Sequence, residues 1–241
     1  MKRAVAVIPA RYESTRFPGK PLALILGRPM LQRVYEGVRE ARLVERVIIA
    51  TDDERIRKAA ESFGAEARLT SRTHSSGTER AAEAAQSIDN NIIINVQGDE
   101  PLVSGELVDS LVKALQDEAV PMASLMARVR ELSLMADPNI VKVVTDRDGF
   151  ALYFSRAPLP CGASDFFFQH IGIYGYKRDF LLPFAALKPS RLERLEKLEQ
   201  LRALENGWRI KMVEASAPTL SVDKPDDIIK IEEFLRKKGH A

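Results

Sequence analysis

The sequence predicts an α/β protein with a doubly wound, mostly parallel sheet and an antiparallel insertion that forms a lid. The first observation is that short apolar β-branched runs alternate with segments of helical period through about residue 120. The second is that polar loops follow the ends of these runs, as they do at the carboxyl edge of a parallel sheet. The third is a later change of rhythm, around residues 141–176, to hairpin-like pairs of strands.

The first half of the chain supplies the alternation. The run 92–96 is short, apolar and β-branched, as a central parallel strand should be. Pro29 suits the first turn of a helix, in which Met30, Val34 and Val38 recur at helical spacing. The expected strands are 4–8, 47–50, 65–69, 92–96 and 122–129, and the expected helices are 29–41, 54–63, an Ala-rich one after residue 80, and 106–116.

The second half predicts the insertion. Asp146-Arg147-Asp148-Gly149 lies between two apolar runs, 141–144 and 150–154, which is a hairpin signal. A further apolar run covers 166–176. Leucines three residues apart predict one helix from Arg191 to Leu204, with Glu199 inside the apolar stripe. An acid in this position needs a partner, and the simplest alternative to a functional role is a pair with a neighbouring cation. A strand at 208–213 and a helix opened by Pro225 complete the chain.

Composition limits the class of protein. The chain has 241 residues, 36 Lys and Arg against 34 Asp and Glu, and a net charge of +2. This near balance argues against a nucleic-acid binder. Cys161 is the single cysteine, which fits a reducing compartment. We expect a cytoplasmic protein, because the apolar run after Lys2 and Arg3 is too short for a signal peptide and no stretch approaches the roughly 20 apolar residues of a membrane span.

The loop after the first apolar run concentrates positive charge. Arg11, Arg16 and Lys20 lie among three prolines, which prevent a helix. Three cations at the end of a strand suit a triphosphate better than a single carboxylate. The sequence around Lys20 matches neither a Walker loop nor a dinucleotide fingerprint, so side chains should hold the phosphates. The alternative is a solvated basic surface loop.

Two acids are candidate metal ligands. Asp99 follows the 92–96 run and would face the cationic loop across the sheet edge. An acid beside a triphosphate is repulsive unless a metal lies between them, and Mg²⁺ takes one or two carboxylates plus phosphate oxygens. Asp223 is the second candidate. Alternatively, Asp99 is a turn or helix-capping residue, and Asp223 caps the helix that Pro225 opens.

The motifs taken together resemble the 3-deoxy-manno-octulosonate cytidylyltransferase (CMP-Kdo synthetase) family. The matching stretches cover nearly the whole chain in family order, and NVQGDEP, ALYFSR, HIGIYGY and LEQLR are specific to this family. The stretches are IPARYESTRFPGKPL, ATDDERI, HSSGTERAAE, NVQGDEP, VKVV, ALYFSRAPLP, HIGIYGY, LEKLEQLRALENG and VDKPDD.

The resemblance implies a single domain of the nucleotide-diphospho-sugar transferase type. Residues 1–130 would bind nucleotide, 131–215 would bind sugar and form an interface, and 216–241 would return to the core as a C-terminal helix. It also implies a Mg²⁺-dependent attack of the anomeric hydroxyl of Kdo on the α-phosphorus of CTP, with release of pyrophosphate, for lipopolysaccharide biosynthesis. The partners would be CTP, an acidic eight-carbon sugar and a second copy of the chain, with no nucleic acid and no membrane.

The same resemblance assigns site residues by role. The catalytic residues would be Arg11, Lys20 and Asp99; the nucleotide-binding residues Ala10, Arg11, Arg16, Lys20, Ser76, Gly77 and Gln97; the sugar-binding residues Gln97, Arg156, His170, Tyr174, Glu199 and Gln200; and the metal ligands Asp99 and Asp223. Taken singly, His170 would be a core histidine, Tyr174 a packing residue and Arg156 a surface cation. His74 is interpreted as structural.

The chain departs from the family pattern in two places. Ser221 and Lys224 flank Val222-Asp223, where the family usually has Gly and Thr, which bears on the second metal ligand. The segment from Cys161 to Gln169 is short, which bears on the lid and on sugar selectivity. Two alternatives therefore remain open: the same chemistry on another acidic sugar, such as 8-amino-Kdo, and a nucleotide-binding module without turnover.

Overall fold

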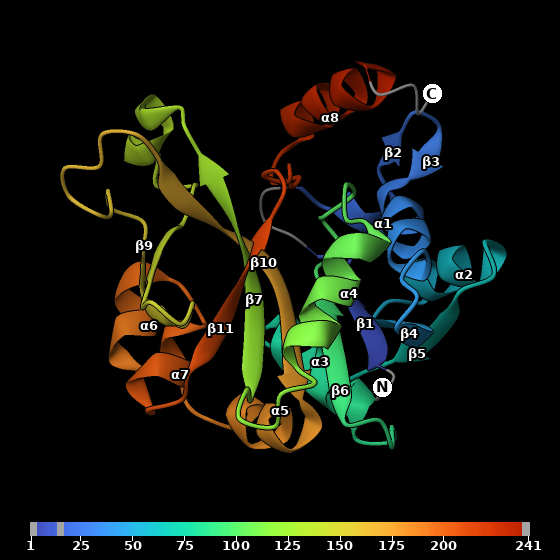
Figure 1. Cartoon of the computed structure of the whole chain (residues 1–241). Helices are drawn as coiled ribbons and strands as arrows, with labels where there is room; N and C mark the ends of the chain where they lie inside the picture. The colour runs from blue at the N-terminus through green and yellow to red at the C-terminus, as the bar shows by residue number, and fades with distance from the viewer. Residues whose placement is uncertain (1–3, 14–16, 238–241) are drawn as a thin grey trace.

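A mixed nine-stranded sheet forms the centre of the computed structural model, which describes residues 4–13 and 17–237 (Figure 1). Its principal strands are β1 (Ala4–Ala10), β4 (Val44–Thr51), β5 (Glu66–Leu69), β6 (Ile92–Val96), β7 (Met122–Val129), β10 (Phe167–Lys177) and β11 (Ile210–Ala215). They lie in the order β11-β7-β10-β6-β1-β4-β5. The predicted α/β class and mostly parallel sheet are confirmed.

The parallel half of the sheet holds the cationic loop and the acidic loop at the same edge. Strand β1 pairs in parallel with β4 on one side and with β6 on the other, so that Val7 lies opposite Ile48 and Asn95. Every residue of β1 and β6 is buried, which explains why both are almost entirely apolar, with Asn95 in β6 as the polar exception. Because both strands end at one edge, residues 10–13 and 97–100 emerge side by side.

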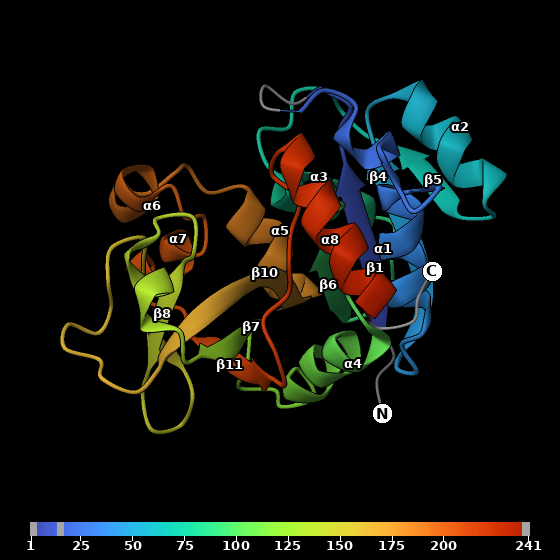
Figure 2. The same ribbon diagram turned by 90° about the horizontal axis from the view of Figure 1, so that it is seen from above.

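Helices cover both faces of the sheet (Figure 2). One apolar core lies under α1 (Met30–Arg39), α2 (Glu54–Ser62) and α4 (Gly105–Ala114). The other lies under α3 (Gly77–Ala85), α5 (Arg178–Ala185) and the short helix α7 (Leu201–Glu205). Of these helices, α5 was missed by the sequence analysis, because Pro183 lies inside it. In the part of the chain that the structure describes, no helix combines the length and apolarity needed to cross a membrane.

Strand β10 is more than part of a lid. It runs antiparallel between β6 and β7. At its N-terminal end, Phe168 and Gln169 also pair with β8 (Lys142–Thr145), which forms a hairpin with β9 (Ala151–Ser155). The predicted hairpin is present, and the single long strand β10 joins it to the main sheet. The insertion is therefore fixed to the central sheet by backbone hydrogen bonds.

The predicted helix from Arg191 to Leu204 is wrong in its middle. The segment forms α6 (Arg191–Glu196) and α7, and Lys197 between them adopts a left-handed conformation with φ 55°. A left-handed residue ends a helix. Leu195 is exposed whereas Leu198 and Leu201 are buried, so the leucines do not form one continuous face. The break leaves Glu199 and Gln200 on a turn that faces the sheet.

The C-terminal helix forms a small third core with the start of the chain. Helix α8 (Pro225–Lys237) places Ile231 and Leu235 against Ile25 and Met30. Ile25 belongs to a two-stranded ribbon of β2 (Leu24–Ile25) and β3 (Arg28–Pro29). Figure 1 shows α8 beside this ribbon, above the carboxyl edge of the sheet. The last helix therefore holds residues 219–223 across that edge.

Candidate active site

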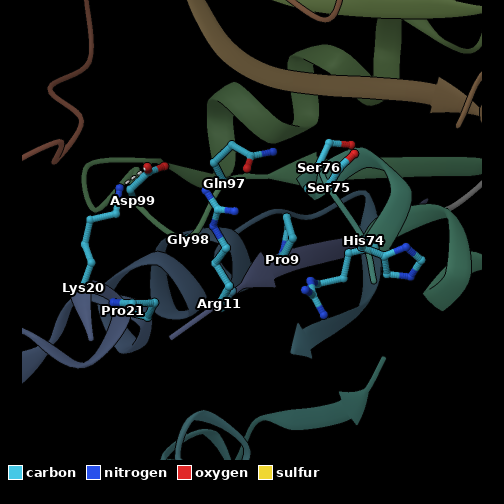
Figure 3. A pocket seen from close by; sticks show the side chains of 13 residues that line it. Pro9, Arg11, Lys20, Pro21, His74, Ser75, Ser76, Gln97, Gly98 and Asp99 are labelled. Carbon is cyan, nitrogen blue, oxygen red and sulfur yellow. Dashed lines mark hydrogen bonds and ion pairs between the residues drawn. The ribbon is translucent and has the colours of Figure 1, made fainter. Parts of the chain in front are cut away.

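A polar cavity of about 290 Å³ lies at the carboxyl edge of β1 and β6 (Figure 3). The cationic loop forms one wall, the start of α3 forms another, and the turn after β6 forms the floor. Its lining residues are Pro9, Ala10, Arg11, Lys20, Pro21, His74, Ser75, Ser76, Gly77, Arg80, Gln97, Gly98 and Asp99. Six of the predicted nucleotide-binding residues are thus brought together, and the seventh, Arg16, lies outside the described residues.

The wall at α3 packs closely against the turn after β6. The side chain of Ser76 caps the helix by accepting from the backbone N–H of Glu79. A Cβ on Gly77 would lie 2.7 Å from Gln97 Oε1, so only glycine leaves Gln97 in place there. Gly98 approaches the carbonyl oxygen of Pro9 in a similar way, which brings the two loops together. The helix N-terminus adds a partial positive charge at this wall.

Lys20 joins three segments that are distant in sequence. Its Nζ donates to Asp99 Oδ2 at 2.5 Å and to the carbonyl oxygen of Val222 at 2.8 Å. The backbone N–H of Val222 in turn donates to the carbonyl oxygen of Asp99 at 3.0 Å. Asp223 is therefore the neighbour in sequence of a residue that is hydrogen-bonded to the backbone of Asp99. The segments that carry the two predicted metal ligands, Asp99 and Asp223, are thus in direct backbone contact.

Glu100 is a buried acid next to this cluster. Burial, reinforced by the charges of Asp99 and Asp223, raises the pKa of Glu100 to about 8. Thr219 Oγ1 donates to Glu100 Oε2 at 3.1 Å, which ties the segment before Asp223 to the turn after β6.

The cluster fits a Mg²⁺ ion in the chemistry of its donors. The Lys20 ammonium lies between a carboxylate and a backbone carbonyl, so this position attracts a cation. Carboxylates of Asp99 and Asp223 are the hard oxygen ligands that Mg²⁺ takes together with phosphate oxygens. Among the described residues, no group of three or more His, Cys, Asp and Glu side chains is arranged to hold a metal.

A second cavity of about 240 Å³ opens on the other side of Asp99. It shares Gln97 and Asp99 with the first cavity, so a molecule in one would meet a molecule in the other at these two residues. The residues that line it are Gln97, Asp99, Glu100, Asn139, Val141, Gln169, His170, Ile171, Gly172, Tyr174, Leu198, Gln200, Thr219 and Ser221. The predicted sugar-binding residues Gln97, His170, Tyr174 and Gln200 are brought together here.

Arg156 is placed against the backbone and not among the residues that line either described cavity. Its guanidinium donates to the carbonyl oxygens of Pro138, Glu196 and Lys197, at 2.8, 2.8 and 3.4 Å. Its backbone N–H donates to Glu196 Oε2. In this structure Arg156 thus joins the turn after α6 to the loop before β8.

Glu199 connects the two halves of the site. Its carboxylate accepts from Ser76 Oγ at 3.0 Å and from Thr78 Oγ1 at 2.7 Å, and Arg202 lies 3.7 Å away. Burial raises its pKa. The acid in the leucine stripe therefore has its expected partners, but two of them are hydroxyls on α3. Glu199 contacts the wall of the first cavity, although it was predicted for the sugar side.

Some residues that line the cavities were not predicted as site residues. Arg80 is buried and donates to Asp52 Oδ2 at 2.8 Å and to Thr70 Oγ1, which fixes the 70–76 loop. His74, interpreted as structural, lines the first cavity and contacts Glu83. Asp52, His74 and Arg80 all lie inside the stretches ATDDERI and HSSGTERAAE, but an Arg–Asp pair separated by 28 residues leaves no local pattern that would reveal the contact.

Comparison with known proteins gives consistent results. The family model described as "Cytidylyltransferase" matches residues 5–212. The chain is 52% identical to the 3-deoxy-manno-octulosonate cytidylyltransferase of Syntrophotalea carbinolica, over 96% of this chain and 98% of that protein. It is 50% identical to the protein of the same name from Geotalea uraniireducens, over 98% and 100%.

Solved structures agree with these relatives. A CMP:2-keto-3-deoxy-manno-octonic acid synthetase complexed with CTP superposes with a TM-score of 0.93 at 40% identity, covering 98% of this chain and 99% of that one. A 4-diphosphocytidyl-2C-methyl-D-erythritol synthase from Anaerococcus prevotii gives a TM-score of 0.66 at 14% identity, over 98% and 99%, and shares the fold.

Proposed function

The chain belongs to the 3-deoxy-manno-octulosonate cytidylyltransferase family, and we propose that its two adjoining cavities bind CTP and Kdo on either side of Asp99. It is a cytidylyltransferase that makes CMP-Kdo from CTP and Kdo for lipopolysaccharide biosynthesis. The proposed placement of the two substrates rests on one observation: Gln97 and Asp99 are the two lining residues that both cavities share.

On this proposal the first cavity holds the nucleotide. Arg11, Lys20 and the start of α3 supply the positive charge that a triphosphate requires. Catalysis of this type depends on positioning and charge neutralisation more than on a covalent nucleophile. Lys20 is tied to Asp99 and to Val222, so it lies where the two cavities join and would neutralise charge on the reacting phosphate.

The second cavity holds the acceptor sugar. A polyhydroxylated acid needs both donors and acceptors, and Gln97, Gln169, Gln200, Tyr174 and Asn139 supply them. The anomeric hydroxyl would then face the shared boundary.

Asp99 and Asp223 would hold a Mg²⁺ ion. The pairing of Val222 with Asp99 keeps these two aspartates on adjoining segments, which supports the assignment. A bound Mg²⁺ would neutralise phosphate charge and lower the pKa of a coordinated hydroxyl.

A pyrophosphate-release assay tests the assignment of substrates. With CTP and Mg²⁺ present, we expect release with Kdo and none without sugar. Release of pyrophosphate only with another acidic sugar, such as 8-amino-Kdo, would show that this sugar and not Kdo is the substrate. Binding of CTP without release under any sugar would indicate a nucleotide-binding module.

We also propose that the chain works as a homodimer in the cytoplasm. Leu152 on β9 and Leu195 on α6 have exposed fractions of 61% and 66%. The two elements are joined by a hydrogen bond from Ser155 to Glu196, so both leucines belong to one unit of the insertion. Exposed leucines of this size favour contact with another protein surface. Light scattering on the wild-type protein and on Leu152→Asp would test this contact.

A further inference from the structure

A row of hydrogen-bonded polar side chains leads from the lining of the second cavity into the sheet. Tyr174 OH donates to Gln200 Oε1 at 3.2 Å, and Gln200 Nε2 lies 3.4 Å from His170 Nδ1. His170 Nε2 lies 2.9 Å from Ser124 Oγ. Tyr174, Gln200 and His170 line the cavity, whereas Ser124 is fully buried behind them on β7.

Ser124 lies at an irregularity in the sheet. Strands β7 and β10 pair regularly up to Ile171 opposite Leu125, and pairing resumes with Tyr174 opposite Ser124. The two extra residues on β10 form a bulge. The carbonyl oxygens of Ile171 and Ile173 therefore both turn toward Ser124, and its Oγ lies 3.2 and 2.9 Å from them.

These two carbonyl oxygens determine the direction of proton donation along the row of hydrogen bonds from Ser124 to Tyr174. A serine hydroxyl has one proton to donate and accepts with its lone pairs. If that proton went to His170, Ser124 Oγ would face two carbonyl oxygens with no hydrogen between them, inside the protein. The proton of Ser124 therefore goes to the bulge, and Ser124 Oγ accepts a proton from His170 Nε2.

The remaining groups then follow in order. Burial lowers the pKa of His170 to about 3, so its ring is neutral and carries one N–H. With the proton on Nε2, Nδ1 is an acceptor and receives the amide N–H of Gln200. The amide orientation of Gln200 leaves its oxygen for Tyr174. Tyr174 donates inward, and its oxygen is left as an acceptor toward the cavity.

We propose that Ser124 is a positioning residue that holds His170 in its Nε2–H tautomer and thereby fixes the amide orientation of Gln200 on the sugar side of the site. The proposal rests on the proposed function for its effect on the sugar. In the reverse direction Gln200 would donate to Tyr174, and Tyr174 would present a donor to the cavity. Ser124 thus selects which pattern of donors and acceptors meets the hydroxyls of the sugar.

The tautomer is measured by NMR on the full-length chain labelled with ¹⁵N-histidine. Of the three histidines, at 74, 170 and 240, the signal of His170 is assigned with His170→Gln. We expect the Nε2–H tautomer in the wild type and in Ser124→Thr, and a switched or mixed tautomer in Ser124→Ala. An Nδ1–H tautomer in the wild type would overturn the proposal.

Steady-state kinetics supply the second measurement. For Ser124→Ala we expect the KM for Kdo to rise about tenfold, which is the effect of about one misdirected hydrogen bond, with the KM for CTP unchanged. Ser124→Thr keeps the hydroxyl and should keep the KM. The matched control is Ser110→Ala, which removes a hydroxyl that donates to a backbone carbonyl within α4.

The outcomes separate the inference from the function that it rests on. A Ser124→Ala variant with the wild-type tautomer and KM would overturn the inference. If Ser124→Ala does not fold, the wild-type tautomer and the KM of Ser124→Thr decide. If the wild type does not turn over CTP with Kdo, the proposed function fails, and the tautomer still decides the role of Ser124.

Discussion

At the scale of single residues, we propose that the pair of Lys20 and Asp99 serves catalysis more than stability. The two side chains are 15% and 30% exposed, so their ion pair contributes about 1 kcal/mol or less to stability. We expect Asp99→Asn to lower kcat by a factor on the order of 100 or more while Tm changes little, because the variant loses the proposed metal ligand and a charge partner of Lys20.

A matched acid outside the site provides the control for Asp99. Asp146 lies on the β8–β9 hairpin in an exposed pair with Arg209. Asp146→Asn should leave kcat and the Mg²⁺ requirement unchanged. If Asp99→Asn retained the wild-type dependence on Mg²⁺ concentration, Asp99 would not be a metal ligand.

Glu199 gives a second residue-scale prediction, because its partners lie on the nucleotide side. We expect Glu199→Gln to raise the KM for CTP roughly fivefold, since an amide offers one acceptor oxygen where the carboxylate receives both Ser76 and Thr78. Glu61→Gln, which alters an exposed pair with Arg57 on α2, is the control. A rise confined to the KM for Kdo would instead support the sugar-binding role that the family resemblance implied.

The residues that could be predicted from sequence share one property. Arg11, Gln97 and Asp99 lie just after the ends of two apolar strands, and Lys20 ends the cationic loop that follows the first of them, so the topology of a parallel sheet brings them together. The partners of Arg156 could not be predicted in this way, because they are backbone carbonyls on two separate turns. Backbone acceptors carry no residue-type signal, so a sequence does not reveal them.

At the scale of elements, α8 acts as a support for Asp223. Ile231 is fully buried in the small core beneath this helix, and Glu232 Oε1 accepts from the backbone N–H of Leu26. We expect Ile231→Ala to cost about 2–4 kcal/mol of unfolding free energy and to raise the Mg²⁺ concentration needed for half-maximal rate. The second effect follows because the 219–223 segment loses its anchor.

The same helix provides the control for that prediction. Ile229 has an exposed fraction of 60%, and Ile229→Ala should change the unfolding free energy by less than about 0.5 kcal/mol. Chemical denaturation and a Mg²⁺ titration of the rate would be compared for both variants. An equal loss of stability in the two variants, or an unchanged Mg²⁺ titration in Ile231→Ala, would contradict the supporting role of α8.

Elements differed in how well the sequence predicted them, and the reason is periodicity. The buried parallel strands were predicted because each is a short apolar run bounded by polar loops. The 191–204 segment keeps a helical leucine spacing, yet it breaks at Lys197. The break places Gln200 next to His170 and Glu199 next to Ser76, so tertiary contacts override the local preference.

At the scale of the whole molecule, two buried groups make opposite contributions to stability as pH changes. Burial raises the pKa of Glu100 to about 8, so its contribution is fully present below its unfolded pKa of about 4.5 and is lost as pH rises through 8. Burial lowers the pKa of His170 to about 3, so its contribution is present above its unfolded pKa of about 6.5 and is lost as pH falls through 3.

The two effects overlap between about pH 4.5 and 6.5, where each changes the unfolding free energy by about 1.4 kcal/mol per pH unit in opposite directions. We therefore expect the wild type to show a nearly flat stability there. Glu100→Gln should lose stability as the pH falls from 6.5 to 5, because only the His170 effect remains. His170→Gln should gain stability as the pH falls from 8 to 5, because only the Glu100 effect remains.

Urea denaturation at a series of pH values, with EDTA and without nucleotide, measures these slopes directly. EDTA matters because a cation held by Asp99 and Asp223 would favour ionised Glu100 and weaken its slope. Parallel slopes in the wild type and both variants would show that neither group differs in pKa between the folded and unfolded chain. Opposite slopes would show that Glu100, next to Asp99, and His170, which lines the second cavity, are both held neutral by one folded core.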